Sequence, residues 1–93
     1  MLKEERRQLT DKSLDLKRAI DSLREEVEAV DFYNQRADAC QDENLKKILI
    51  HNANEEKEHA ATLSAWICQH DENFAKEFKK YIFTEEADIS SLE

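Results

Sequence analysis

The stretch Cys40-Gln41-Asp42-Glu43 decides the fold, because it separates two long helical patterns in a chain of 93 residues. Asp42 is a favourable residue for capping the start of a helix, and Glu43 places a negative charge in the first turn that follows. On both sides of this break, apolar side chains recur at spacings of three and four residues. Two long helices joined by so short a turn must lie antiparallel, so the sequence predicts a helical hairpin.

The same periodicity predicts an all-α chain with a third, shorter helix after the hairpin. We expect helices over about residues 12–39, 43–69 and 73–83, with Asp11 or Ser13 capping the first, and residues 1–10 loosely ordered. Residues 84–93 are expected to be a tail, and residues 1–93 a single domain. The apolar positions of the first helix are Leu16, Ile20, Leu23, Val27, Val30 and Ala37.

Composition supports long helices and an oligomer. The chain has no glycine and no proline, and 39% of its residues are charged, which favours helices over sheets. A chain this short buries little core by itself. We therefore expect a second copy to cover the apolar stripe of each hairpin.

Charge, hydropathy and cysteine content limit the classes of binding partner and the cellular compartment that we expect for the chain. A net charge of −8 argues against nucleic acid and is compatible with attracting cations. No apolar run approaches the length of a membrane span, so no membrane partner is expected. Cys68 lies about 27 residues beyond the turn, roughly 40 Å from Cys40. Free thiols are therefore expected, as in a reducing cytoplasm.

Glu56 and His59 form the most informative motif of the chain. At spacing i and i+3 they project from the same face of the second helix. Burying two ionisable groups is costly unless they have partners, and a metal ion is a partner that suits both. The competing interpretation is a surface Glu–His pair on a solvated face. The other members of this face are Leu45, Ile48, Leu49, Asn52, Leu63, Trp66 and Ile67.

Glu26 is predicted to lie beside this motif. It precedes Gln41 by fifteen residues, and Glu56 follows Gln41 by fifteen. In an antiparallel hairpin both lie at one height, about 22 Å from the turn. The sequence therefore places two carboxylates and one imidazole at the same level.

This set is half of a known metal site. Ferritin-like di-iron and di-manganese proteins take one Glu from each of two helices and a Glu-x-x-His from each of the other two. A twofold dimer of hairpins would supply the full set in a four-helix bundle. Oxygen-rich ligation with one imidazole per metal suits iron or manganese. The bridging carboxylates would be either Glu56 or Glu26 of each chain.

Three stretches resemble the encapsulated ferritins, and the likeness covers about residues 18–84. The first helix of that family resembles residues 23–40, LREEVEAVDFYNQRADAC. The second resembles residues 51–60, HNANEEKEHA, and the end of the third resembles residues 81–84, YIFT.

The resemblance implies a ferroxidase. Fe(II) would be oxidised by dioxygen or peroxide at a di-iron centre between two chains, with Glu26, Glu56 and His59 as ligands and two irons per dimer. Calcium, manganese or zinc can occupy such ligands in place of iron. The resemblance also implies a ferritin-like half-bundle, a ring of dimers forming a decamer, and cytoplasmic storage of iron inside an encapsulin shell.

Further site residues follow from the resemblance only. Tyr33 matches a tyrosine that lies close behind the family's iron ligands. Glu25, Glu28 and the aromatic position 32 resemble its metal-entry site. Position 32 is Phe where the family usually has Trp, which removes an N–H donor. The family's shell-targeting tail has no recognisable counterpart in residues 85–93.

Two alternative functions fit the same residues. The first is a helical-hairpin dimerisation and interaction module, held by its apolar faces, in which metal is incidental. The second is a related di-metal oxidase or peroxidase that uses the same ligands without storing iron. The metal content of the protein separates the first alternative from a ferroxidase, and iron turnover in excess of the sites separates the second.

Overall fold

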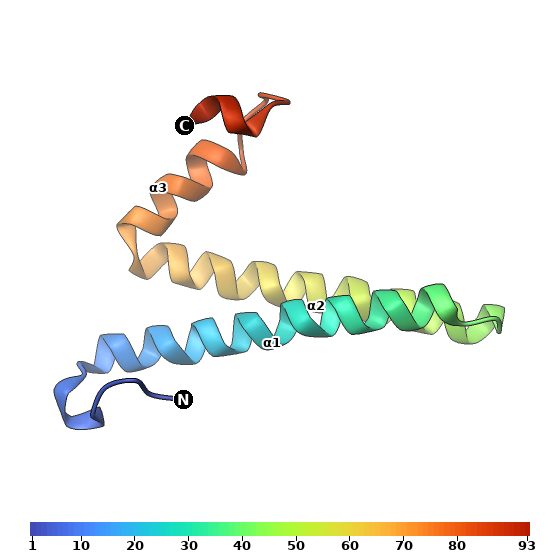
Figure 1. Cartoon of the computed structure of the whole chain (residues 1–93), viewed down its shortest axis with the longest axis horizontal. Coiled ribbons are helices and arrows are strands. Elements are labelled where there is room, and N and C mark those ends of the chain that lie inside the picture. The colour runs from blue at the N-terminus through green and yellow to red at the C-terminus, as the bar shows by residue number, and fades with distance from the viewer.

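The computed structural model describes residues 1–93 and contains only helices (Figure 1). Two long antiparallel helices form a hairpin, and a shorter third helix leaves it at an angle. Short 3-10 helices, η1 and η2, lie near the two ends of the chain. The bounds are η1 Arg6–Gln8, α1 Asp11–Ala39, α2 Glu43–His70, α3 Glu72–Tyr81 and η2 Ile89–Leu92. The predicted all-α hairpin is confirmed.

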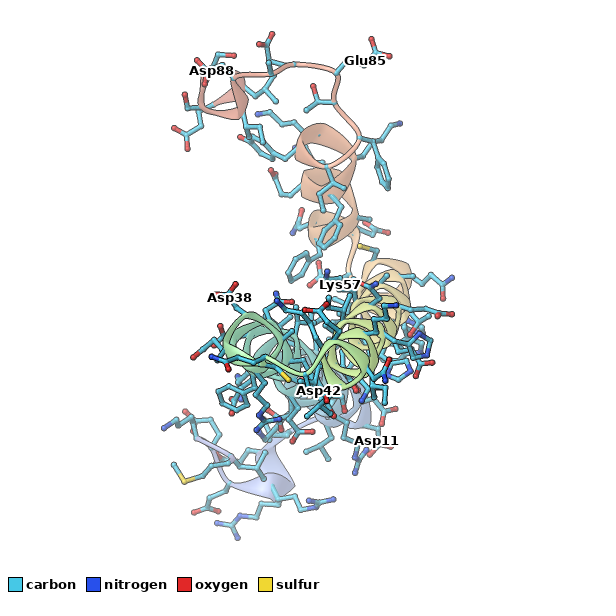
Figure 2. All side chains as sticks on the ribbon, turned by 90° about the vertical axis from the view of Figure 1, so that its right-hand side faces the viewer. Asp11, Asp38, Asp42, Lys57, Glu85 and Asp88 are labelled. Carbon is cyan, nitrogen blue, oxygen red and sulfur yellow. The ribbon has the colours of Figure 1, made fainter.

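The turn and the bend after α2 are both set by aspartates. Asp42 Oδ1 accepts a hydrogen bond from the backbone N–H of Leu45 at 2.8 Å, as expected for the cap of α2. Asp71 does the same for α3, accepting from the N–H of Phe74 at 3.0 Å. Its extended backbone ends α2 and redirects the chain. Consequently α3 packs on α2 and makes no contact with α1, and Figure 2, viewed along the hairpin, shows it rising away from the pair.

Three details of the helices differ from the sequence-based expectation. The cap of α1 is Thr10, not Asp11 or Ser13, and its hydroxyl accepts from the N–H of Ser13 at 3.0 Å. The preceding segment, expected to be loose, includes η1. The third helix ends at Tyr81 instead of residue 83, and η2 follows within the predicted tail.

The N-terminal segment meets α1 at a cluster of charges. Lys17 donates a hydrogen bond to Asp21 at 2.8 Å, and Arg24 reaches the same carboxylate at 3.1 Å. The bond from Lys17 holds the pKa of Asp21 below its usual range and raises the pKa of Lys17. The amino group of Met1 lies beside Lys17, and this contact lowers the pKa of that amino group.

The core of the chain is thin. Its only buried residues are Ala19, Ala37, Ala53 and Ile67. The three alanines allow the two long helices to approach closely, but they remove little apolar area from water. No helix is both long enough and apolar enough to cross a membrane.

The exposed surface is larger than that of a compact domain. The accessible area is 7523 Å², against roughly 5,600 Å² for a compact monomer of 11.0 kDa. The radius of gyration is 17.0 Å, against about 12 Å for a compact domain of this length. Large apolar side chains stand exposed along the hairpin, among them Val27, Leu45, Ile48 and Ile50.

The cap of α2 gives a direct test of the turn. Replacing Asp42 by alanine removes the bond to Leu45 N–H, so we expect the free energy of unfolding to fall by about 1 kcal/mol. Asp38→Ala is the matched control, because Asp38 lies exposed in the last turn of α1, where a negative charge is unfavourable. Urea unfolding followed by circular dichroism, at one protein concentration, measures both. An equal loss in the two variants would contradict the capping role.

Candidate metal centre

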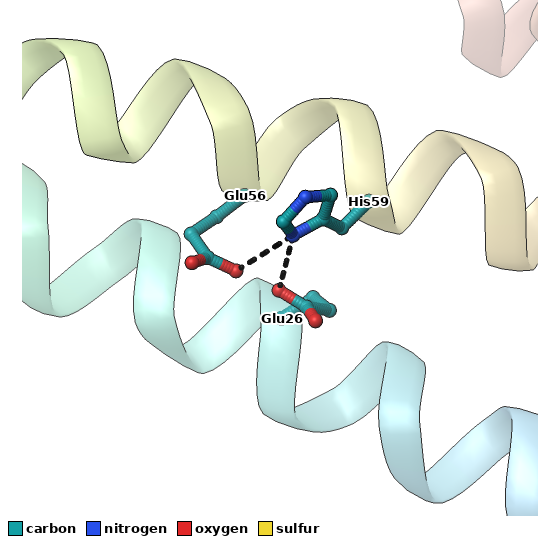
Figure 3. A group of neighbouring side chains, drawn as sticks. All are labelled: Glu26, Glu56 and His59. Carbon is teal, nitrogen blue, oxygen red and sulfur yellow. Dashed lines mark ion pairs between the residues drawn. The ribbon is translucent and has the colours of Figure 1, made fainter.

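Three side chains converge halfway along the hairpin. Glu26 projects from the middle of α1, while Glu56 and His59 project from the middle of α2 toward it (Figure 3). One ligand atom of each residue lies within 4.8 Å of the other two. The structure thus brings together the three residues that the sequence places at one level, from the equal distances of Glu26 and Glu56 to the turn.

The distances suit a shared ion better than direct hydrogen bonds. His59 Nδ1 lies 3.5 Å from Glu26 Oε2 and 3.4 Å from Glu56 Oε2. Charge-assisted hydrogen bonds are shorter, about 2.7–2.9 Å. Two donors that each bind one ion at about 2.1 Å are themselves roughly 3–3.5 Å apart. The imidazole nitrogen therefore stands at ligand spacing from both carboxylates.

The site is more open than the sequence predicted. The Glu26 and Glu56 side chains are 26% and 23% exposed, but that of His59 is 53% exposed. Ile48, expected on the same core-facing stripe, is 56% exposed. In the single chain the stripe is only partly buried, because α1 covers only one side of it. The carboxylates of Glu26 and Glu56 lie between the two helices, and His59 is the most exposed of the three ligands (Figure 3).

The donor set has a clear chemical preference. Two carboxylates and one imidazole form an oxygen-rich set that matches hard or borderline divalent cations such as Fe(II) or Mn(II). Three donors from one side leave the remaining coordination positions of an ion open. Such a site can accept further ligands from water, a substrate or another chain.

The other predicted site residues lie outside this group. Glu25 and Glu28 are exposed on α1, and neither belongs to the set of converging ligands. Tyr33 is half-buried, and the Arg36 guanidinium lies over its ring at 5.6 Å. The same guanidinium lies 5.8 Å from the centre of the Phe32 ring.

A second His–Glu pair on α2 lacks a third group. His51 Nε2 and Glu55 Oε1 are 2.8 Å apart on the exposed surface, and no other acidic or thiol group joins them. His51 is therefore a surface residue in this chain. The pair also shows that a His–Glu pair by itself does not make a site.

One contact was not anticipated from the sequence. The Trp66 and His70 rings stack, with centroids 4.0 Å apart and planes 20° from parallel. His70 Nδ1 lies 2.8 Å from the backbone oxygen of Trp66. The i, i+4 spacing of the two aromatic rings is the signal in the sequence that could have indicated this stack.

Comparisons with known proteins agree on one family. A family model described as EncFtn-like matches residues 1–85. An encapsulated ferritin-like protein of Rhodospirillum rubrum is 47% identical over 77 residues, which cover 83% of this chain and 55% of that protein. A ferritin-like protein of Thermotoga maritima is 44% identical over 78 residues, 84% of this chain and 68% of that protein.

A solved structure extends the agreement to the fold. Protein NE0167 from Nitrosomonas europaea has 54% sequence identity and a TM-score of 0.88, with 94% of this chain and 96% of that chain covered. The present chain spans only about half the length of the Rhodospirillum relative. On the family match and the identities together, the chain belongs to the EncFtn-like family.

Proposed function

We propose that the protein is a ferroxidase that oxidises Fe(II) to Fe(III) at a di-iron centre formed between two chains. The observation that carries this proposal is the convergence of Glu26, Glu56 and His59 on an uncovered face of the hairpin. The ferritin-like names of the relatives support iron as the metal.

Two chains are proposed because a single chain has too few metal ligands and leaves a large surface exposed. A single hairpin offers three donor residues, fewer than the coordination number of iron, whereas between two hairpins a carboxylate can bridge two ions and serve as a ligand to both. The accessible area of the chain, 7523 Å², exceeds that of a compact monomer by roughly 1,900 Å². Two chains would have roughly 3,800 Å² of such excess between them, which falls in the range that obligate dimer interfaces bury.

The proposed chemistry uses the ligands in distinct ways. The carboxylates of Glu26 and Glu56 favour Fe(III) over Fe(II), because the higher charge gains more from anionic ligands. Neutral His59 completes the set without adding charge. Two Fe(II) ions give two electrons to dioxygen, which takes up two protons and leaves as hydrogen peroxide. Exposed Glu25 and Glu28 would raise the local concentration of Fe(II), and Tyr33 would pack close to the centre.

The setting of the reaction is proposed from the relatives. Because the Rhodospirillum protein is named encapsulated, we infer that this chain also works inside an encapsulin shell in the cytoplasm. Dimers would join into a decameric ring, and the shell would hold the iron mineral that an open ring cannot enclose.

Aerobic Fe(II) oxidation by the purified protein tests the site. Glu26→Ala, Glu56→Ala and His59→Ala each remove one donor, so we expect each to lower the oxidation rate by at least about tenfold. His51→Ala and Glu55→Ala are the matched controls, since they break an exposed His–Glu pair on the same helix. If the ligand variants oxidise iron as fast as the controls, the site assignment is wrong.

Metal content and assembly form a second test. We expect about one tightly bound iron per chain, and chelation should shift the protein toward smaller species because metal binding stabilises the dimer. Elemental analysis and size-exclusion chromatography with light scattering measure the two quantities.

Unchanged assembly with no bound metal would favour the alternative of a dimerisation module held by exposed apolar side chains. Turnover that stops at the number of sites would favour a di-metal oxidase or peroxidase without iron storage.

A further inference from the structure

Trp66 lies in the same groove as the metal ligands. It follows His59 by seven residues on α2, which is two helical turns or about 10 Å along the axis. A shallow hollow of about 430 Å³ in the α1–α2 groove is lined by Trp66, Leu63, Ser22, Ala19, Asp15 and Arg18. The Arg18 guanidinium is paired with the Asp15 carboxylate at 2.7 Å, which offsets its charge. Leu63 is one turn from His59, and Ser22 is one turn from Glu26. The indole therefore belongs to the surface that leads directly away from the candidate centre.

Trp66 is distinguished from the tyrosines by what lies over its ring. The chain has one tryptophan and two tyrosines. The Arg36 guanidinium covers the Tyr33 ring at 5.6 Å, and the Lys80 ammonium covers the Tyr81 ring at 5.0 Å. A cation over an aromatic face is attracted to the intact ring, and it opposes removal of an electron from that ring. Trp66 stacks instead on the His70 imidazole, at 4.0 Å.

From this contrast we propose that Trp66 is an electron donor to the metal centre, an inference that rests on the proposed ferroxidase function. It acts when hydrogen peroxide, the product of dioxygen reduction, meets a centre that holds a single Fe(II). Peroxide needs two electrons to become two hydroxide ions, and one Fe(II) supplies only one. Trp66 supplies the second, so that no hydroxyl radical is released.

The step balances in atoms and electrons. Fe(II), hydrogen peroxide and the intact indole give Fe(III), two hydroxide ions and the indole radical cation. The radical cation then loses its N–H proton to water. No polar side-chain atom of the chain is buried without a partner, and the indole N–H, which has no partner within the chain, is open to water. A later Fe(II) and one proton return the radical to tryptophan.

The stacked His70 keeps the donor in place. His70 Nδ1 meets the backbone oxygen of Trp66 at 2.8 Å, so this nitrogen carries the hydrogen and the ring is held face to face with the indole. Cys68, the nearest thiol in sequence, lines the apolar groove between α2 and α3 instead. Trp66 is thus the oxidisable side chain on the ligand side of α2.

Freeze-quench electron paramagnetic resonance tests the proposal. The protein is loaded anaerobically with one Fe(II) per two chains and mixed with one equivalent of hydrogen peroxide. We expect a tryptophan radical in the parent and in Tyr81→Phe, and none in Trp66→Phe. Trp66→Tyr should move the signal to a tyrosyl radical. Fe(II) oxidation by dioxygen at full loading should change by less than about twofold in Trp66→Phe.

The outcomes separate this inference from the proposed function. If the parent oxidises iron but forms no radical, or forms one that survives in Trp66→Phe, the donor role is overturned. If the parent oxidises no iron at all, the ferroxidase proposal fails and this inference fails with it. Mass spectrometry gives an independent reading, since Trp66→Phe should accumulate oxidised side chains near the ligands under repeated peroxide exposure and the parent should not.

Discussion

The structure depends on holding two carboxylates and an imidazole together in the middle of a two-helix hairpin. Glu26 and Glu56 come from opposite helices, and each lies within 3.5 Å of the same nitrogen of His59. Like charges brought this close repel unless a cation, or a protonated His59, lies between them. The helices must therefore be held from elsewhere. The alanines at positions 19, 37 and 53 do this, because small side chains at the contact allow the backbones to pack closely along most of the hairpin.

This arrangement also explains why a single chain buries so few of its residues. Because the ligands occupy the middle of the contact between α1 and α2, the hairpin cannot fill that position with apolar side chains. The result is a domain with four buried residues and a large accessible area. A second copy related by a twofold axis would complete the ligands and cover the apolar side chains in one step. Function and stability would then depend on the same association.

The sequence predicted the parts that follow from local rules. The break at residues 40–42 and the i, i+3 and i+4 periodicity predicted the hairpin, and equal distances from Gln41 placed Glu26 opposite Glu56. It could not predict what depends on the neighbours of a face. His59 and Ile48 lie on the expected stripe, yet they are exposed, because periodicity identifies a face and does not say whether another helix covers it. The cap at Thr10 was missed because three positions within four residues, Thr10, Asp11 and Ser13, offered suitable side chains, and geometry selected among them.

The sequence also could not predict which side chains lie against each aromatic ring. These neighbours differ between the two directions along the groove. Tyr33 and Trp66 each lie seven residues from a ligand, the first toward the turn and the second toward the open end. Spacing alone makes them equivalent. Arg36 over one ring and His70 against the other make them electrically different. A flanking cation raises the free energy of removing an electron from a ring. In the proposed ferroxidase, the position of Arg36 on the Tyr33 side would therefore direct oxidation toward Trp66.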